Sequence, residues 1–165
     1  MSVIIRPALL SDLPSVLKII NYEILNTTSI YDYEPRNLEQ QTAIFHHKKE
    51  SHFPFLIAIL NGEVVGFGTY GQFRIKEGNQ FTVEHSVYVA VNYTGRGIGK
   101  MLLEELIALA KKQKLHTMIG VIDSENQDSI AFHEKHGFKI VGTIKESGYK
   151  FNRWLDTVFV QLFLK

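Results

Sequence analysis

Thr94-Gly95-Arg96-Gly97-Ile98-Gly99-Lys100 is the stretch that decides how the rest of the sequence is interpreted. Its three glycines stand at alternate positions, directly after a run of β-branched and aromatic residues and directly before an apolar helical pattern. Such glycines let the backbone approach a ligand closely, and the free N–H groups that begin a helix attract anions. The stretch therefore predicts a turn that binds a phosphate group. A turn whose glycines only need a positive φ is the alternative.

Other nucleotide-binding motifs fit this stretch poorly. A P-loop requires a glycine at the position of Thr94 and a serine or threonine at the position of Met101. A dinucleotide fingerprint requires a glycine at the position of Lys100, and it follows the first strand of its fold rather than lying past the middle of the chain. The spacing suits the pyrophosphate of an acyl-coenzyme A.

The segments that flank the turn alternate between strand and helix patterns. A strand is predicted over 81–91, and a helix over about 97–113 with apolar residues on one side. A further strand is predicted over 116–122 and a short helix over about 126–136, which ends at Gly137.

The N-terminal part begins with a short strand over 3–6. Ser11-Asp12 is predicted to cap a first helix, and a polar loop with aromatic residues follows over 26–35. Asn37 and Gln40 have the spacing of a capping box at the start of a second helix.

The remaining strands complete a sheet. Asn61-Gly62 lies between the β-rich runs 55–60 and 64–70 and predicts a hairpin. Two final strands are predicted over 139–145 and about 157–164. These elements together indicate an α/β (α+β) fold whose sheet has mixed pairing.

Composition limits the architecture and the partners. A chain of 165 residues with 45% hydrophobic residues predicts one domain, 1–165. Lys+Arg (18) nearly balance Asp+Glu (17), so we expect no nucleic-acid partner. The absence of cysteine excludes a disulfide, a cysteine-ligated zinc site and a thiol nucleophile. No apolar run reaches about 18 residues, so we expect no membrane partner and a cytoplasmic enzyme.

The stretch 82–138 resembles the core of the GCN5-related N-acetyltransferase (GNAT) superfamily. The family's pyrophosphate loop reads Gln/Arg-x-x-Gly-x-Gly/Ala, and this sequence departs from it only at Thr94. Residues 126–138 are similar to the family's second cofactor-binding segment. The resemblance implies a central mixed, mostly antiparallel twisted sheet of about seven strands flanked by about four helices.

A closer resemblance covers nearly the whole chain. Residues 82–89, His133-Glu134, 152–156 and Tyr31 together resemble the phosphinothricin / methionine sulfoximine N-acetyltransferase subfamily. This resemblance implies a homodimer that uses the C-terminal strands. It also implies transfer of an acetyl group from acetyl-CoA to the primary amine of a small amino-acid-like molecule. A protein or peptide N-acetyltransferase and a non-catalytic acetyl-CoA-binding module are the alternatives.

Two residues are the catalytic candidates. Glu84 matches the subfamily's acidic position, where a carboxylate can accept a proton from the attacking ammonium. His133 stands where many relatives have a tyrosine that protonates the departing thiolate, so it is a candidate acid or substrate ligand. A salt-bridged surface Glu84 and a merely packed His133 are the structural alternatives. Since the chain has no cysteine, direct transfer in a ternary complex is expected.

The cofactor candidates come from three segments. Val87-Tyr88-Val89 resembles the stretch whose backbone pairs with the pantetheine arm, in the manner of an added strand. The resemblance carries contacts with the same arm onto Asn126 and Ser129. The turn contributes Gly95, Arg96, Gly97, Ile98, Gly99 and Lys100. No metal is expected, because His133-Glu134-Lys135-His136 lacks the zincin spacing and a third ligand.

The acceptor's carboxylate requires cations. Arg74 and Lys76 match the positions where the subfamily holds its substrate's acidic end, and a solvated basic loop is the alternative. Three further residues are predicted to line the same pocket: Tyr31, His85 and Ser86. Asn79 stands where close relatives often have tyrosine, which leaves a broader range of amine acceptors open. The family also has a bulge near Glu84, which would break the alternation of Glu84, Ser86 and Tyr88 on one face.

Overall fold

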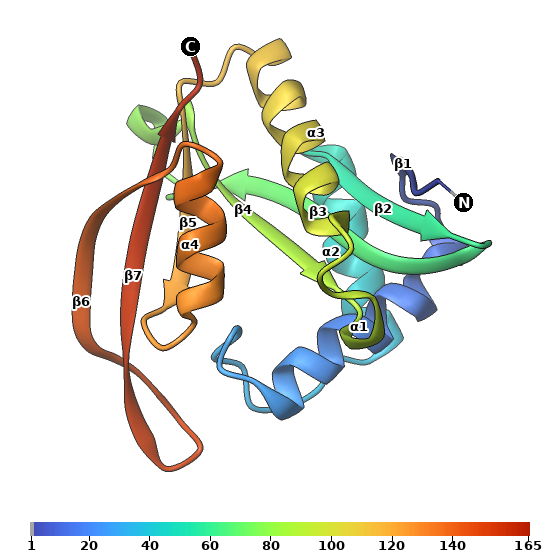
Figure 1. The fold of residues 1–165 in the computed structure, drawn as a ribbon. Coiled ribbons are helices and arrows are strands. Elements are labelled where there is room, and N and C mark those ends of the chain that lie inside the picture. The colour runs from blue at the N-terminus through green and yellow to red at the C-terminus, as the bar shows by residue number, and fades with distance from the viewer. Residues whose placement is uncertain (1) are drawn as a thin grey trace.

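The computed structural model describes residues 2–165 as a seven-stranded sheet with four α-helices (Figure 1). The strands are β1 (Ile4–Pro7), β2 (Phe55–Leu60), β3 (Glu63–Gln72), β4 (Thr82–Val89), β5 (Thr117–Asp123), β6 (Lys139–Lys150) and β7 (Arg153–Phe163). The helices are α1 (Leu13–Asn26), α2 (Leu38–Glu50), α3 (Ile98–Lys112) and α4 (Gln127–Lys135). The predicted fold class and numbers of strands and helices are confirmed.

The sheet opens between its two middle strands. Its order is β1-β2-β3-β4-β5-β7-β6, and β4–β5 is the parallel pair among otherwise antiparallel neighbours. β4 and β5 pair over three positions only, which end at Glu84 and Ile119, although β4 continues to Val89 and β5 to Asp123. The two strands therefore part and leave a gap at the centre of the sheet (Figure 1).

Helices cover both faces of the sheet. Apolar residues of α1 and Phe45 of α2 pack on one face, against Phe55, Ile57 and Phe67. The amphipathic stripe of α3 packs on the other face, where Leu102 and Leu106 are fully buried. None of the helices in residues 2–165 combines the length and the apolar character that crossing a bilayer requires.

Local signals account for several element ends. Asn61 (φ 54°) and Gly62 (φ 82°) are both left-handed, as the two-residue β2–β3 hairpin requires. The capping box is present, because the Asn37 Oδ1 accepts from the Gln40 N–H and the Gln40 Oε1 accepts from the Asn37 N–H. Asp12 is the N-cap residue of α1, as predicted, but its side chain caps no N–H of that helix, because its carboxylate accepts from the Arg6 guanidinium, at 2.8 and 3.0 Å.

The C-terminal hairpin is longer than the sequence predicts. β6 extends beyond the expected 139–145 to Lys150, and β7 begins at Arg153 rather than near Thr157. Register shifts between Ile144 and Gly148 interrupt the hydrophobic alternation, which is why the extension carries no clear strand pattern. The tip of this hairpin reaches the segment that follows α1, as described below.

Candidate active site

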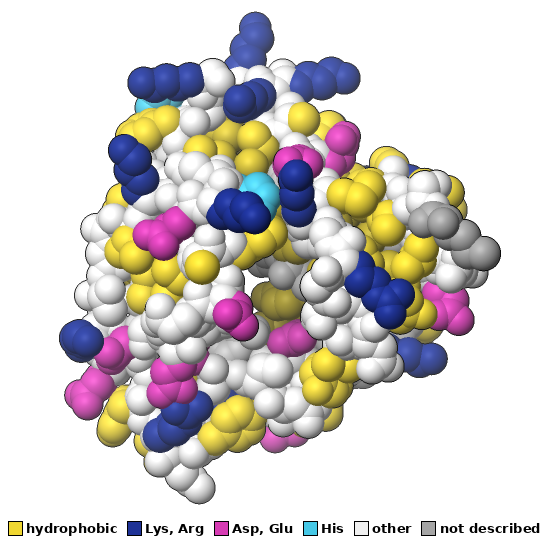
Figure 2. All heavy atoms as spheres, in the orientation of Figure 1, with side chains coloured by type: hydrophobic (Ala, Val, Ile, Leu, Met, Phe, Trp, Pro, Cys, Tyr) yellow, Lys and Arg dark blue, Asp and Glu magenta, His cyan; other side chains and the backbone are white. Residues whose placement is uncertain are grey.

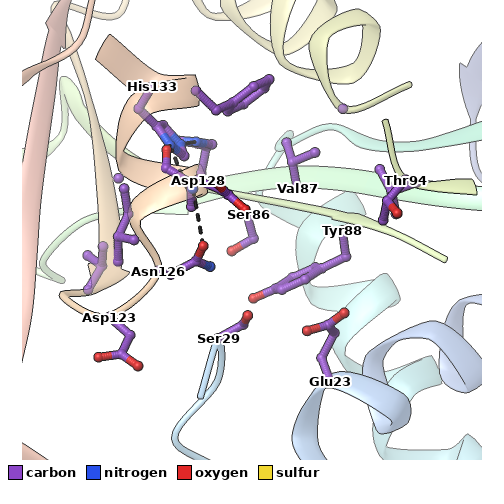
Figure 3. Close-up of a pocket in the computed structure, with 18 residues that line it drawn as sticks. Glu23, Ser29, Ser86, Val87, Tyr88, Thr94, Asp123, Asn126, Asp128 and His133 are labelled. Atoms are coloured by element: carbon purple, nitrogen blue, oxygen red, sulfur yellow. Dashed lines mark hydrogen bonds between the residues drawn. The ribbon is translucent and has the colours of Figure 1, made fainter. Parts of the chain in front are cut away.

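A cleft lies where β4 and β5 part. Its cavity measures about 370 Å³, and the flanks come from β4, β5 and α4, with the end of α1 and the segment after it on the far side (Figure 3). Figure 2 shows the hollow near the centre of one face, with Asp and Glu side chains beside it and Lys and Arg side chains above it. Nine of the predicted site residues line it: His85, Ser86, Val87, Tyr88, Val89, Gly99, Asn126, Ser129 and His133.

The backbone of β4 is free on the side of the cleft. Ala90 donates its N–H to the Val65 carbonyl and Thr82 accepts from the Phe73 N–H, so even-numbered residues bond to β3. The N–H and C=O groups of Val87 and Val89 therefore point toward the gap that β5 has left. The register of β3 with β4 is continuous here, so the expected bulge is absent from this pairing.

The glycine turn continues the cleft. Gly95 (φ 75°) and Gly97 (φ 78°) are left-handed, and Gly97 is the N-cap residue of α3. A side chain at either position would force a strained backbone. The N–H groups of the first turn of α3 lack acceptors within the helix. The turn borders a cavity of about 640 Å³, which shares Val89, Thr94, Gly99 and Phe132 with the central cleft.

Charge differs between the two ends of the cleft. The turn cavity is lined by Lys100, Lys135 and His136, with Glu104 as its acidic residue. The central cavity is instead lined by the carboxylates of Glu23, Asp123 and Asp128. Arg96 lies outside both cavities, with its guanidinium 5.2 Å from the centre of the Tyr93 ring.

Asn126 has a structural role that its predicted ligand role does not exclude. Its Oδ1 accepts from the Ser129 N–H at 3.1 Å and so caps α4 (Figure 3). The Asn126 side chain also lines the cleft, as does Ser129. The cap fixes the first turn of α4 against the open edge of β5.

Glu84 lies half-buried on β4 beside the point where β5 parts from it. Burial raises the pKa of its carboxyl group, and the nearby ammonium of Lys48 partly offsets that rise. Lys48 donates from Nζ to the Tyr70 carbonyl at 3.0 Å, and burial lowers its own pKa. The pKa of the Glu84 carboxyl group is thus raised above its ordinary value, and a carboxylate with a raised pKa suits a proton acceptor.

His85 and His133 form a buried pair, and the two residues are 6% and 8% exposed. Their Nε2 atoms are 2.9 Å apart. The His85 Nδ1 lies 3.0 Å from the Ile119 carbonyl oxygen, and the His133 Nδ1 lies 2.6 Å from that of Ser129. Within residues 2–165, no three His, Asp or Glu side chains are grouped as metal ligands.

A smaller cavity of about 200 Å³ adjoins the cleft on the side of α1. Glu84, Tyr31 and Ser29 line it. The Tyr31 ring lies against Gly148, where an added Cβ would come within 2.3 Å of the ring. Thr28 donates its hydroxyl to the Asp123 carboxylate and so ties this segment to the end of β5.

A buried lysine holds the same segment from the other side. The Lys150 ammonium donates to the carbonyl oxygens of Ile24 (2.6 Å), Thr27 (2.8 Å) and Ile30 (2.6 Å). All three donors of the ammonium are thereby used, and the carbonyls that end α1 gain a cation as partner. The tip of the β6–β7 hairpin thus fixes the wall of the smaller cavity.

Arg74 and Lys76 lie apart from both cavities. They occupy the exposed segment between β3 and β4, where the Lys76 N–H donates to the Arg74 carbonyl. Within one copy of the chain the structure therefore does not bring these two cations to the cleft. Their role toward an acceptor stays a prediction.

Sequence reasoning missed several residues around the cleft. Asp123 follows a buried strand and could have been found as a polar residue at a strand end. Ser29 and Thr28 sit in a polar loop with no motif, and Lys150 and Lys48 become buried only through contacts distant in sequence. No local signal would have found these four.

The comparisons with known proteins agree with this geometry. A model of the acetyltransferase (GNAT) family matches residues 20–138, which is well over half of the chain. The chain belongs to the acetyltransferase (GNAT) family. It is therefore an N-acetyltransferase.

The acetyltransferase is similar to proteins with several acceptors in their names. It is 44% identical to the L-methionine sulfoximine/L-methionine sulfone acetyltransferase of Pseudomonas aeruginosa, over 98% of this chain and 95% of that protein. It superposes with a TM-score of 0.96 on the phosphinothricin acetyltransferase of Sinorhizobium meliloti in complex with AcCoA (33% identity; 99% and 89% covered). It superposes equally, at 0.96, on the ribosomal-protein-alanine N-acetyltransferase of Brucella melitensis (42% identity; 97% and 99% covered).

Proposed function

We propose that this acetyltransferase transfers the acetyl group of acetyl-CoA to the primary amine of a small amino-acid-like acceptor of the methionine sulfoximine or phosphinothricin type. The observation that carries the proposal is the half-buried Glu84, which lines a small cavity beside a larger cleft edged by free strand backbone. The 44% identity to a protein named for methionine sulfoximine supports the acceptor class.

Acetyl-CoA fits the cleft by three chemical matches. Its pantetheine amides can pair with the free N–H and C=O groups of Val87 and Val89. Its pyrophosphate suits the open amides of the glycine turn, with Lys100 beside them. Asn126 and Ser129 line the same cleft as Val87, Val89 and His133. The bound molecule supplies the acetyl thioester.

The chain's own residues then handle protons. Glu84 accepts a proton from the acceptor's ammonium, which exposes the nitrogen lone pair. The nitrogen bonds to the acetyl carbon, the thioester C–S bond breaks, and the amine gives up a second proton. One proton leaves with Glu84 to solvent, and the other is needed on the departing sulfur. We assign the transfer of this second proton to the sulfur to the part of the cleft that His133 lines.

The proposal includes a cytoplasmic homodimer. The edge strand β6 and its neighbour β7 expose a set of large apolar side chains: Ile140, Val141, Ile144, Trp154 and Phe163. An exposed apolar edge strand favours burial against another chain. Sedimentation of the purified protein tests this, with a concentration-independent monomer as the contrary result.

A protein N-terminus is the second candidate acceptor. The similarity to a protein named for ribosomal-protein alanine favours it. The smaller cavity favours the free amino acid, because its volume of about 200 Å³ and its wall at Tyr31 leave little room for a chain.

One assay separates these functions. Acetyl-CoA-dependent thiol release is measured with methionine sulfoximine, methionine sulfone, phosphinothricin, the free protein amino acids and short peptides that begin with alanine. We expect release with the sulfoximine-type acceptors. Release with peptides alone would overturn the acceptor class, and no release with any amine, despite acetyl-CoA binding, would favour a non-catalytic module.

A further inference from the structure

The contacts of His85 and His133 demand more protons than two neutral imidazoles carry. Each Nδ1 faces a backbone carbonyl oxygen, at 3.0 Å for His85 and 2.6 Å for His133. A carbonyl oxygen can only accept, so each Nδ1 needs a hydrogen. The Nε2–Nε2 contact of 2.9 Å needs one hydrogen as well. Three hydrogen bonds therefore require three N–H hydrogens, whereas two neutral rings provide two.

The neutral pair is consequently left one bond short. One of the two N···O contacts must then place a nitrogen lone pair against an oxygen lone pair. A third proton would complete all three bonds, but burial opposes the positive charge it brings. Burial lowers the pKa of both imidazoles, to about 3 for His85. Geometry favours the third proton and burial opposes it, so the resting pair is neutral near pH 7 and can take up a third proton in acid or from a nearby reaction.

The surroundings of the pair are shaped for two rings, and the cleft that both rings line also carries the carboxylates of Glu23, Asp123 and Asp128. Among the described residues, the titratable groups that act on the pair are the two rings themselves and His136 of α4, and no carboxylate bonds to either ring. Gly120 of β5 makes room for the pair, because an added Cβ would lie 3.0 Å from the His85 Cε1 and 3.4 Å from the His133 Cδ2. The Phe138 ring packs against both imidazoles.

We propose that His85 and His133 act as one proton-holding unit, in which His85 is a positioning residue that sets the protonation state of His133. The inference rests on the proposed function. The unit takes the second proton of the amine as its third hydrogen and returns it to the sulfur when the thioester C–S bond has broken, so its own charge is restored. The Ser129 hydroxyl lies 3.5 Å from the His133 Nδ1 and Ser129 lines the cleft, so we assign to this hydroxyl the connection between the unit and the reacting groups.

Two measurements on the full chain test the unit. The first is kcat with the acceptor found active, for His85→Gln, His133→Gln and the double variant, with the exposed His47→Gln as control. Residues that act as a unit are not additive. We expect each single variant to lose about 10-fold to 100-fold and the double variant to lose no more than the larger single loss. Losses that multiply would overturn the proposal.

The second measurement needs no activity and therefore separates this proposal from the proposed function. The ¹⁵N resonances of the histidine rings are followed against pH in the wild-type protein and in both single variants. We expect His85 and His133 to respond at one shared midpoint, and the remaining ring of each variant to move its midpoint by about 1 pH unit. Independent midpoints that the partner's removal leaves unchanged would overturn the unit, even in a protein that acetylates amino acids.

Discussion

The two ends of the cleft are built in opposite ways. The turn between β4 and α3 offers backbone groups of consecutive residues, and its left-handed Gly95 and Gly97 are set by local conformation. The smaller cavity beside Glu84 is instead walled by residues 28–31, in a segment that is held by side chains far away in the chain. Lys150 reaches back to Ile24, and Thr28 reaches forward to Asp123.

This difference predicts two kinds of sensitivity. A site made of backbone tolerates most side-chain changes and fails where a glycine is replaced. A site assembled by buried polar contacts fails when one distant partner is removed, because the remaining groups are left unsatisfied. Four substitutions test that contrast.

Glu84→Gln tests the chemistry that both ends serve. The amide cannot accept the ammonium's proton, so we expect kcat to fall by about 10²-fold to 10⁴-fold near neutral pH. The deficit should shrink at alkaline pH, where the amine loses its proton without help. The KM for acetyl-CoA should not change, since the carboxylate lies in the smaller cavity. Glu50→Gln, at the exposed end of α2, is the matched control, and an unchanged kcat for Glu84→Gln would remove it as the base.

Lys150→Met tests the assembled end. Loss of the ammonium leaves three carbonyl oxygens without their donor, which we expect to cost about 2–4 kcal/mol in the free energy of unfolding. The segment that carries Ser29 and Tyr31 should loosen, so the KM for the acceptor should rise about 10-fold while that for acetyl-CoA stays within about twofold. Lys145 lies on the same strand as Lys150 and forms an exposed ion pair with Asp156 of β7. Lys145→Met removes that pair and should change neither KM value. Equal rises in both KM values would break the comparison.

Gly97→Ala tests the backbone end. A left-handed alanine costs about 1–2 kcal/mol, so the first turn of α3 should shift and the KM for acetyl-CoA should rise about fivefold. The acceptor's KM should stay constant. Arg96→Ala, one residue earlier and outside both cavities, should have little effect on either KM. A larger loss from Arg96→Ala would mean that side chains, not backbone, hold the pyrophosphate.

Lys48→Met tests the electrostatics of Glu84. The ammonium lowers the pKa of the Glu84 carboxyl group, which burial raises. Without the ammonium that pKa rises further, so Glu84 stays protonated up to a higher pH. The acid limb of the profile of kcat/KM against pH should therefore move upward, by less than about 1 pH unit. A downward shift would contradict the proposed role of Lys48.

The parts of this molecule that follow short-range rules were predictable. Asn61-Gly62 specifies its hairpin because both residues adopt a left-handed backbone easily, and Asn37 with Gln40 closes a capping box within four residues. The glycine turn lies where its spacing indicated, between β4 and α3. Its role in binding a pyrophosphate stays a prediction.

The assembled parts were not predictable. Asp12 stands at the predicted N-cap position but makes no capping hydrogen bond, because Arg6 and the Leu9 N–H occupy its carboxylate. His85 was expected to line the acceptor pocket; it borders the smaller cavity beside Glu84, but both of its ring nitrogens are engaged by Ile119 and His133. Lys150 has no sequence signal, because a lysine on a strand is normally exposed and only the fold supplies three carbonyls around it.

Because β4 and β5 part, hydrogen exchange of backbone amides can report on one region of the sheet. Amides inside a sheet usually exchange slowly with solvent, because a neighbouring strand accepts their hydrogen bonds. The Val87 and Val89 amides point into the gap, so they should exchange as quickly as those of an edge strand, although they lie at the centre of the sheet. Adding acetyl-CoA should slow both, while amides on even-numbered residues of β4 stay protected throughout. The sheet thus carries its own reporter of cofactor binding.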